Sequence, residues 1–570
     1  MMSLFKFVSF GLTFLGIGFV KSQVLVQTSQ GQISGFHANY GSDKSQLWYG
    51  EADVFLGIPY VQAPIGNLRF AKPVPLTKFP TTPLNATNFG PACPQTYNLR
   101  GLSMSEDCLY LNVFTPNAAS TYKYSVMVFI HGGAFTTGHT GDFPTPGIVR
   151  NLVSRDVVVV TIQYRLGLLG FFTTHSDDFP PNLGMLDQNE AIRWVQNEIS
   201  NFGGDPYRIT LFGQSAGSAS VSAHIFSPTS QNMFQQAIME SGSILTSFEG
   251  SMGLQNLSES RAYQLCSFTQ EQWKARQWNL LKDCIQTMDY EKFLGAENLN
   301  VHGWQIVQDN YFMPDVPRNL YKNRPNIPVI YGNNKDEWSL VDLQLLASGD
   351  NPITTYTRQY VEFVFQVYAY YLAEREADVQ GILEGVYVPP GTADNDNVAW
   401  LKIINDMFSG ISFTSFVGRE IEWFVFNQNS QVYTYEFLFP TQVGRPTTIP
   451  GWEPIFHCSE MYLIFMPDFY WQPLYDNGTL SPDEFKVANY LGSTWTNFAK
   501  YGKPTLDDSW QPTTSIGITT QEYLQINVET QMAKGFRSTD QLLWNKALPA
   551  IIGQWPPELP DYNNGTVVEF

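Results

Sequence analysis

Short apolar runs that end at glycine or proline recur along the first half of the chain. Residues 32–36 and 53–60 have this pattern, and 109–114 adds a partial alternation of apolar and polar positions. These patterns predict short strands. Two further runs, 125–130 and 157–162, are almost continuously apolar, which is typical of strands buried on both faces of a parallel sheet.

Helical periodicity appears between these runs. The sequence Asp187-Gln188-Asn189-Glu190 resembles a capping box, and apolar residues follow at helical spacing at 191, 192, 195 and 199. The pattern predicts a helix that starts near Asp187, ends near 202–204 and precedes a strand at 209–212. Alternation of strand and helix indicates an α/β protein with a doubly wound, mostly parallel sheet.

After residue 250 the pattern is looser. We expect helices over 263–288 and 361–383, and strands at 328–331 and 432–439. No repeat, low-complexity segment or clear linker divides the chain. The prediction is therefore one large domain with insertions over residues 23–570.

Residues 1–22 are predicted to be a secretory signal peptide. Lys6 supplies a positive start, residues 7–20 are mostly apolar, and Val20-Lys21-Ser22 fits a small-residue cleavage site. No later run reaches about 18 apolar residues, so no membrane span is expected. We expect a secreted, extracellular protein.

Composition narrows the classes of partner. The 570 residues are 43% hydrophobic, which allows a large core, and the net charge is −19. A strongly acidic chain has no basic stripe for nucleic acid and is repelled by anionic membrane surfaces. A nucleic-acid partner is therefore not expected.

The run at 209–212 is followed by Gly213-Gln214-Ser215-Ala216-Gly217, which fits the G-x-S-x-G nucleophile elbow. In such a turn the glycines avoid collisions with neighbouring backbone, and the serine hydroxyl is raised above the sheet edge at a helix N-terminus. By itself the pentapeptide also fits a strand-to-helix turn without chemistry.

A second glycine-rich loop strengthens the first. His131-Gly132-Gly133-Ala134-Phe135 follows the strand that ends at residue 130 and matches the HGGG-type oxyanion loop, with alanine at the third glycine position. Alanine retains the backbone N–H that such a loop requires. The two loops together are far more specific than either alone.

Five cysteines and four glycosylation sequons fit a secreted chain. The spacing suggests Cys93–Cys108 and Cys266–Cys284 disulfides, although sequence alone does not fix the pairing, and it leaves Cys458 over. The sequons lie at Asn85, Asn256, Asn477 and Asn564, and we expect most of them to carry glycan.

From about residue 24 to residue 544 the chain resembles the type-B carboxylesterase and cholinesterase family of α/β-hydrolases. The resemblance rests on seven motifs in order: 55–60, 66–70, 105–112, the His131 loop, 164–167, 182–188 and 212–217. It implies an α/β-hydrolase fold, an ester substrate, and neither a cofactor nor a metal ion.

The resemblance also supplies a catalytic triad. The family's Gly-x-x-x-Asp-Glu-Gly segment corresponds to 332–338 here, which makes Glu337 the acid and places Trp338 where the family has glycine. The family's His-x-x-Glu pattern makes His457 the base. The order Ser215, Glu337, His457 is that of α/β-hydrolases. By composition alone, Asp336 or Glu337 would be a solvated surface charge.

The implied mechanism is acyl transfer. His457 accepts the Ser215 proton during attack on the ester carbonyl, and Glu337 orients the imidazole. The N–H groups of Gly133, Ala134 and Ala216 would hold the oxyanion.

Supporting residues carry over as well. The resemblance pairs Arg69 with Glu106 and Arg165 with Asp187. The family's third disulfide needs two further cysteines, so Cys458 is expected to be a free thiol.

These features predict a secreted serine carboxylesterase. The alternatives are a cholinesterase-like enzyme, a catalytically inactive adhesion or scaffold relative of the same fold, and a generic binding module. Inactive relatives lack triad members, whereas this chain has all three candidates.

Cholinesterases carry a tryptophan in the loop closed by the first disulfide and a glutamate before the nucleophile. Here the loop 94–107 has only Tyr97 as an aromatic residue, and the other position is Gln214. The sequence gives no prediction of the oligomeric state.

Overall fold

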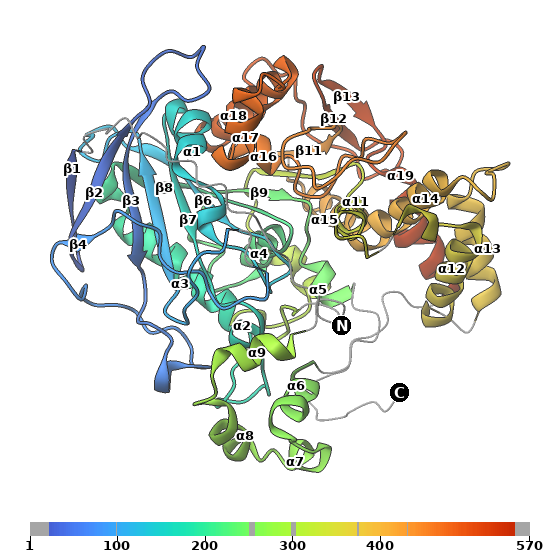
Figure 1. The fold of residues 1–570 in the computed structure, drawn as a ribbon, viewed down its shortest axis with the longest axis horizontal. Coiled ribbons are helices and arrows are strands. Elements are labelled where there is room, and N and C mark those ends of the chain that lie inside the picture. The colour runs from blue at the N-terminus through green and yellow to red at the C-terminus, as the bar shows by residue number, and fades with distance from the viewer. Residues whose placement is uncertain are drawn as a thin grey trace.

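A mixed β-sheet runs through the molecule in the computed structural model (Figure 1). The structure describes residues 22–97, 100–249, 257–297, 304–350, 352–372, 375–429 and 431–552, and the sheet has 13 strands within these ranges. Their order is β1-β2-β3-β5-β7-β6-β8-β9-β10-β11-β12-β13, with β4 beside β2.

The centre of the sheet is parallel and its two margins are antiparallel. Strands β7, β6, β8, β9, β10, β11 and β12 are parallel neighbours, whereas β1, β2, β3 and β5 at one margin and β13 at the other pair antiparallel. This arrangement confirms the predicted α/β class. The strands are β1 (Gln23–Thr28), β2 (Gly31–Asn39), β3 (Glu51–Pro59), β4 (Leu84–Asn85), β5 (Tyr110–Thr115), β6 (Tyr124–Ile130), β7 (Val157–Ile162), β8 (Gly204–Gln214), β9 (Gln236–Glu240), β10 (Val329–Asn334), β11 (Val432–Phe437), β12 (Glu522–Ile526) and β13 (Gln531–Lys534).

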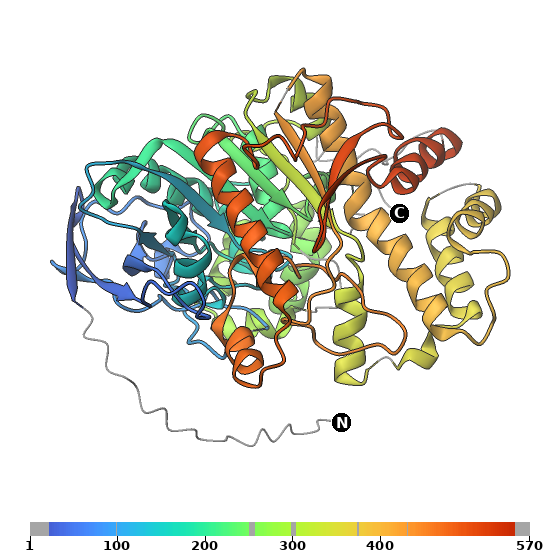
Figure 2. The same ribbon diagram turned by 90° about the horizontal axis from the view of Figure 1, so that it is seen from above.

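Helices cover both faces of the sheet, which is why the central strands are apolar at successive positions. On β6, Val126 and Val128 pack into the core that includes α3 (Leu183–Glu198) and α4 (Ala216–Phe226). Met127 and Phe129 point the other way, into the core formed with α1 (Thr145–Asn151) and α18 (Pro482–Tyr501). Figure 2 shows α18, in orange, lying along this second face.

A third core lies outside the sheet. It is formed mainly by α11 (Ser339–Ser348), α12 (Arg358–Leu372), α13 (Glu376–Tyr387) and α14 (Asn397–Ser409). Figure 1 shows α12, α13 and α14 gathered to one side of the sheet. A π-helical turn, Gly410–Thr414, joins α14 to α15 (Ser415–Phe426).

The remaining helices have at most 10 residues. They are α2 (Gly167–Phe171), α5 (Leu245–Glu249), α6 (Leu257–Cys266), α7 (Gln270–Lys274), α8 (Trp278–Ile285), α9 (Tyr290–Ala296), α10 (Pro317–Leu320), α16 (Met461–Ile464), α17 (Asp468–Asp476), α19 (Ser538–Leu542) and α20 (Leu548–Ile552). None of the helices in the described ranges combines the length and the hydropathy needed to cross a bilayer.

Three helix predictions were wrong in their extent. Helix α3 begins at Leu183, so Asp187 lies inside the helix and pairs with Arg165 instead of capping it. The region 263–288 is divided among α6, α7 and α8, and 361–383 is divided between α12 and α13. Sequence periodicity detected helix in these segments but not the breaks.

The cysteines have the pairing suggested by their spacing. Disulfides join Cys93 to Cys108 and Cys266 to Cys284, and Cys458 is a free thiol. The sequon residues Asn85 and Asn477 are exposed. Asn256, Asn564 and residues 1–21 of the predicted signal peptide lie outside the described residues.

Candidate active site

The candidate nucleophile lies at the sharp turn between β8 and α4. Ser215 has φ 58° and ψ −124°, an unusual conformation for a residue with a side chain. A Cβ at Gly217 would lie 2.0 Å from the Ile130 carbonyl oxygen, and one at Gly213 would lie 2.5 Å from the Gly217 carbonyl oxygen. Both positions therefore require glycine, as the elbow motif predicts, and the turn places Ser215 at the N-terminus of a helix.

The candidate oxyanion loop lies against this turn. A Cβ at Gly132 would meet the Gln214 carbonyl oxygen at 2.6 Å and the Ser215 Cβ at 3.0 Å. Gly133 and Ala134 both have positive φ, at 106° and 53°. The Gly133 carbonyl accepts hydrogen bonds from the N–H groups of residues 136 and 137, which fixes the turn.

The backbone N–H groups of Gly133, Ala134 and Ala216 have no acceptor within the described part of the chain. Ala216 is the first residue of α4, and the first N–H groups of a helix have no partner within the helix. Free N–H groups beside a nucleophile can stabilise a developing negative charge. These are the residues that the sequence predicts for the oxyanion hole.

The candidate acid, Glu337, follows β10 and is 1% exposed. Its Oε1 accepts hydrogen bonds from the Asn334 backbone N–H at 2.7 Å and from Asn333 Nδ2 at 3.1 Å. Its Oε2 lies 2.6 Å from Nδ1 of His457. Together these donors stabilise a carboxylate and orient it toward the histidine.

The candidate base, His457, follows β11 and is partly buried. Because Nδ1 faces the Glu337 carboxylate, the neutral ring carries its proton on Nδ1 and has a free lone pair on Nε2. The phenyl ring of Phe413, on the π-helical turn, packs against the imidazole with centroids 4.8 Å apart. Burial lowers the pKa of His131, in the candidate oxyanion loop, to about 4, and this neutral ring stacks on Tyr164.

The base and the nucleophile meet at Gln214. The Gln214 amide nitrogen lies 3.2 Å from His457 Nε2 and 3.4 Å from Nδ1. Nearly equal distances mean that the amide packs against the ring instead of donating along one lone pair. Among the described residues Ser215 Oγ makes no hydrogen bond to His457, and such contacts are often loose before substrate binds. The structure thus brings Glu337 to His457, and His457 to the residue that precedes Ser215.

The loop that carries Glu337, called the acid loop below, has Trp338 where the family has glycine, and its backbone is not strained by this difference. Trp338, at the family's glycine position, has φ −68°, which any residue can adopt. Its ring stacks on Phe408 with centroids 4.5 Å apart, and its backbone N–H donates to Ser409 Oγ at 3.0 Å. Neither acidic residue before it is solvated, because Asp336 is 3% exposed and Glu337 is 1% exposed. The composition-based expectation of a surface charge is therefore wrong for both, since tertiary hydrogen bonds satisfy them.

Two further carboxyl groups are fully buried behind the triad candidates. Glu240 ends β9 and accepts a hydrogen bond from Trp495 Nε1 at 3.1 Å. Glu460 accepts one from Asn334 Nδ2. Burial raises the pKa of each to about 8, and the charge of Glu240 adds to the shift at Glu460. One oxygen of each is unpartnered in the described structure, so at neutral pH the pair holds at least one proton.

The predicted supporting ion pairs are confirmed. Arg69 pairs with Glu106 and donates to three carbonyl groups at residues 285, 286 and 288. Arg165 makes two hydrogen bonds of 2.7 Å to Asp187, and both side chains are buried. The Arg165 pair fixes the segment after β7 to α3, near the oxyanion loop, whose Phe135 carbonyl accepts from the Gly167 N–H.

Sequence reasoning missed several neighbours of the triad candidates. Asn333 and Asn334 are polar residues at the end of a buried strand, a pattern from which a polar site at that strand end could have been predicted. Phe413 gives no signal, because only the π-helical turn brings it to His457. In the described part of the chain no group of three or more His, Cys, Asp or Glu side chains is placed to hold a metal ion.

Comparison with known proteins identifies a matching family. Residues 22–544 match the model of the carboxylesterase family. Carboxylesterase 1E of Mus musculus is 30% identical over 569 residues, which cover 94% of this chain and 95% of that protein. Acylcarnitine hydrolase of Mus musculus is 31% identical over 92% of this chain and 91% of its own length. Liver carboxylesterase of Sus scrofa is 30% identical over 94% and 95%.

Proposed function

Because the chain belongs to the carboxylesterase family, whose fold is the α/β-hydrolase fold, we propose that it hydrolyses carboxylic esters through an acyl-enzyme on Ser215. The observation that carries this proposal is the 2.6 Å contact between Glu337 and Nδ1 of His457, beside the elbow that holds Ser215. With Nδ1 hydrogen-bonded to Glu337, Nε2 is the ring atom that would accept a proton in this proposal.

In the proposed reaction, Ser215 Oγ attacks the ester carbonyl carbon while its proton moves to His457 Nε2. Glu337 stabilises the imidazolium that forms. The N–H groups of Gly133, Ala134 and Ala216 hold the oxyanion of the tetrahedral intermediate. His457 then protonates the leaving alcohol, and the acyl group remains on Ser215.

Water completes the cycle. It enters after the alcohol leaves, His457 removes its proton, and the resulting hydroxide attacks the acyl carbon. Collapse of the second tetrahedral intermediate releases the carboxylic acid and returns the proton to Ser215 Oγ. No cofactor or metal is required for this sequence of steps.

We further propose a secreted glycoprotein. The signal-peptide pattern at residues 1–22, two disulfides and the exposed sequon residues Asn85 and Asn477 support this assignment. Expression in a eukaryotic cell would test it, with the protein expected in the medium and with a mass that falls on enzymatic removal of N-glycans.

Hydrolysis of a chromogenic short-chain ester tests the activity. The purified chain should turn over the ester, and Ser215→Ala should reduce turnover to the level of the buffer. A folded wild-type protein without activity would instead support the inactive scaffold alternative.

A further inference from the structure

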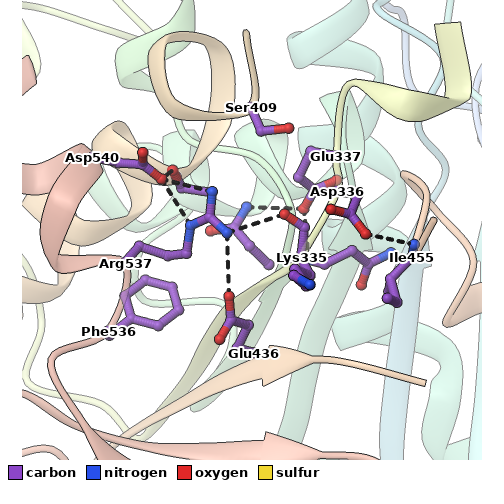
Figure 3. Close-up of polar contacts among 12 residues, drawn as sticks. Lys335, Asp336, Glu337, Ser409, Glu436, Ile455, Phe536, Arg537 and Asp540 are labelled. Atoms are coloured by element: carbon purple, nitrogen blue, oxygen red, sulfur yellow. Dashed lines mark hydrogen bonds and ion pairs between the residues drawn. The ribbon is translucent and has the colours of Figure 1, made fainter. Parts of the chain in front are cut away.

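Asp336, the residue before the candidate acid, connects two loops. The acid loop follows β10 and carries Glu337, and the histidine loop follows β11 and carries His457. Its backbone N–H donates to the Ile455 carbonyl at 3.0 Å, and its carboxylate Oδ2 accepts from the Ile455 N–H at 2.9 Å (Figure 3). Ile455 lies two residues before His457. Two hydrogen bonds between the same two residues fix both the separation and the orientation of the loops.

The carboxylate is held inside the protein. Asp336 is 3% exposed, and burial raises its pKa above the ordinary value. The second oxygen, Oδ1, lies 3.4 Å from Asn405 Nδ2 on α14. A buried carboxyl group is unfavourable unless its partners satisfy it. Because burial of this carboxyl group lowers stability, packing alone does not explain why an aspartate occupies this position.

Arg537 fixes the other side of the acid loop. Its guanidinium donates to the Lys335 carbonyl at 3.1 Å and pairs with Asp540 at 2.7 Å and with Glu436 at 3.3 Å (Figure 3). Glu436 belongs to β11 and Lys335 directly follows β10. The loop is thus anchored to the sheet at Lys335 and to the histidine loop at Asp336.

We propose that Asp336 is a positioning residue that sets the distance between Glu337 and His457 by holding Ile455. This inference rests on the proposed function, because it concerns the same site. The Glu337 to His457 contact depends on two loops that are 120 residues apart in the chain. Asp336 connects them within two residues of each partner, and a misplacement of about 1 Å at a catalytic group can lower turnover about 100-fold.

The test compares Asp336→Asn with Asp336→Ala. Asparagine keeps an oxygen that can accept from the Ile455 N–H, so kcat should stay within about threefold of the wild-type value, whereas alanine should lower kcat by about 100-fold with little change in KM. Asp342→Ala is the matched control. Asp342 is equally buried but accepts a hydrogen bond from Tyr356 and not from Ile455, so its loss should lower Tm and leave kcat unchanged.

The ratio of activity to folded protein separates positioning from a general loss of stability. A loosened Glu337 contact lowers turnover by each folded molecule, so kcat per folded chain should fall in Asp336→Ala and stay near the wild-type value in Asp336→Asn. If Asp336→Ala does not fold, Asp336→Ser is tested in its place. The serine side chain is shorter than that of aspartate, so its hydroxyl should not reach the Ile455 N–H.

A readout without substrate distinguishes this inference from the proposed function. The hydrogen-bonded Nδ1 proton of His457 should give a downfield proton NMR signal in the wild type and in Asp336→Asn, and the signal should be lost in Asp336→Ala. A wild-type protein without esterase activity would overturn the proposed function alone. A signal retained in the alanine variant, or equal losses of kcat in the alanine and asparagine variants, would overturn the role of Asp336.

Discussion

Glu337 Oε2 lies 2.6 Å from His457 Nδ1, and the other carboxylate oxygen is held by the Asn334 N–H and by Asn333. The acid is therefore fixed by its own strand end before it meets the base. This arrangement gives the imidazole one preferred tautomer and one orientation.

Replacement of this acid should reduce turnover strongly. In Glu337→Gln the amide cannot stabilise the imidazolium and favours the wrong tautomer, so kcat should fall by about 10⁴, as in other triads. Steady-state kinetics on a neutral ester measures the loss. Asp336→Asn is the neighbouring control and should lose far less. The opposite ranking of the two variants would contradict the assignment of Glu337.

The buried pair Glu240 and Glu460 predicts a loss of stability as pH rises from about 4.5 to about 8. Both pKa values are raised to about 8, from 4.5 in the unfolded chain. The two groups therefore bind more protons in the folded state than in the unfolded chain over this range, so the stability that they contribute is fully present below about pH 4.5 and is lost as pH rises through about 8. Trp495 and Asn334 contact the pair, and Tyr435, Glu337 and His457 lie near it.

Thermal unfolding at several pH values tests this prediction. Tm should fall between about pH 5 and about pH 8 in the wild type and fall less in Glu240→Gln, which removes one of the two carboxyl groups. Glu529→Gln is the control, because Glu529 is exposed and pairs only with Lys486 among the described residues. The same decline of Tm in wild type and Glu240→Gln would show that the pair is not its source.

Cys458 should be present as a partly buried, unreactive thiol. It is unpaired, and burial raises its pKa well above the ordinary value, so little of the reactive thiolate forms at neutral pH. Without reductant, mass analysis should find no alkylation of the folded protein and one modified site in denaturant. A reducible dimer, or a peptide in which Cys458 is bonded to another cysteine, would contradict this expectation.

Selectivity for choline esters should be low. The loop 94–107 lacks tryptophan, and Gln214 is neutral and packs against His457. The ratio of kcat/KM for a choline ester to that for an uncharged ester of matched size should be near or below one. Gln214→Glu should raise the ratio by roughly five- to tenfold, as expected for about 1 kcal/mol of added attraction. A clear preference of the wild type for the choline ester would favour the cholinesterase alternative.

The sequence predicted the centre of the fold better than its periphery. The runs 125–130 and 157–162 are apolar except at Ser125 and Thr161 because both faces of β6 and β7 are covered, so their pattern has one interpretation. Asp187 misled the helix prediction because its partner, Arg165, is 22 residues away and comes close only in the folded chain. Local capping rules do not contain that contact.

In the candidate site, too, the local motifs could be predicted from the sequence and the contacts between distant segments could not. The turn at Ser215 and the loop after His131 are local motifs whose glycines are explained by close backbone contacts, so their backbone shape could be predicted from the sequence. The burial of Asp336 and the contact of Phe413 with His457 depend on tertiary structure. Asp336 meets Ile455 from a distant loop, and Phe413 faces the imidazole only because a π-helical turn separates α14 from α15. Neither relationship has a periodic pattern in the sequence.

Covalent inactivation by an organophosphate would identify the nucleophile of this protein. Loss of esterase activity should follow one-to-one modification of the chain, peptide mapping should place the phosphoryl group on Ser215, and Ser215→Ala should not be modified. A label on another serine, or near-normal turnover by Ser215→Ala, would show that Ser215 is not the nucleophile.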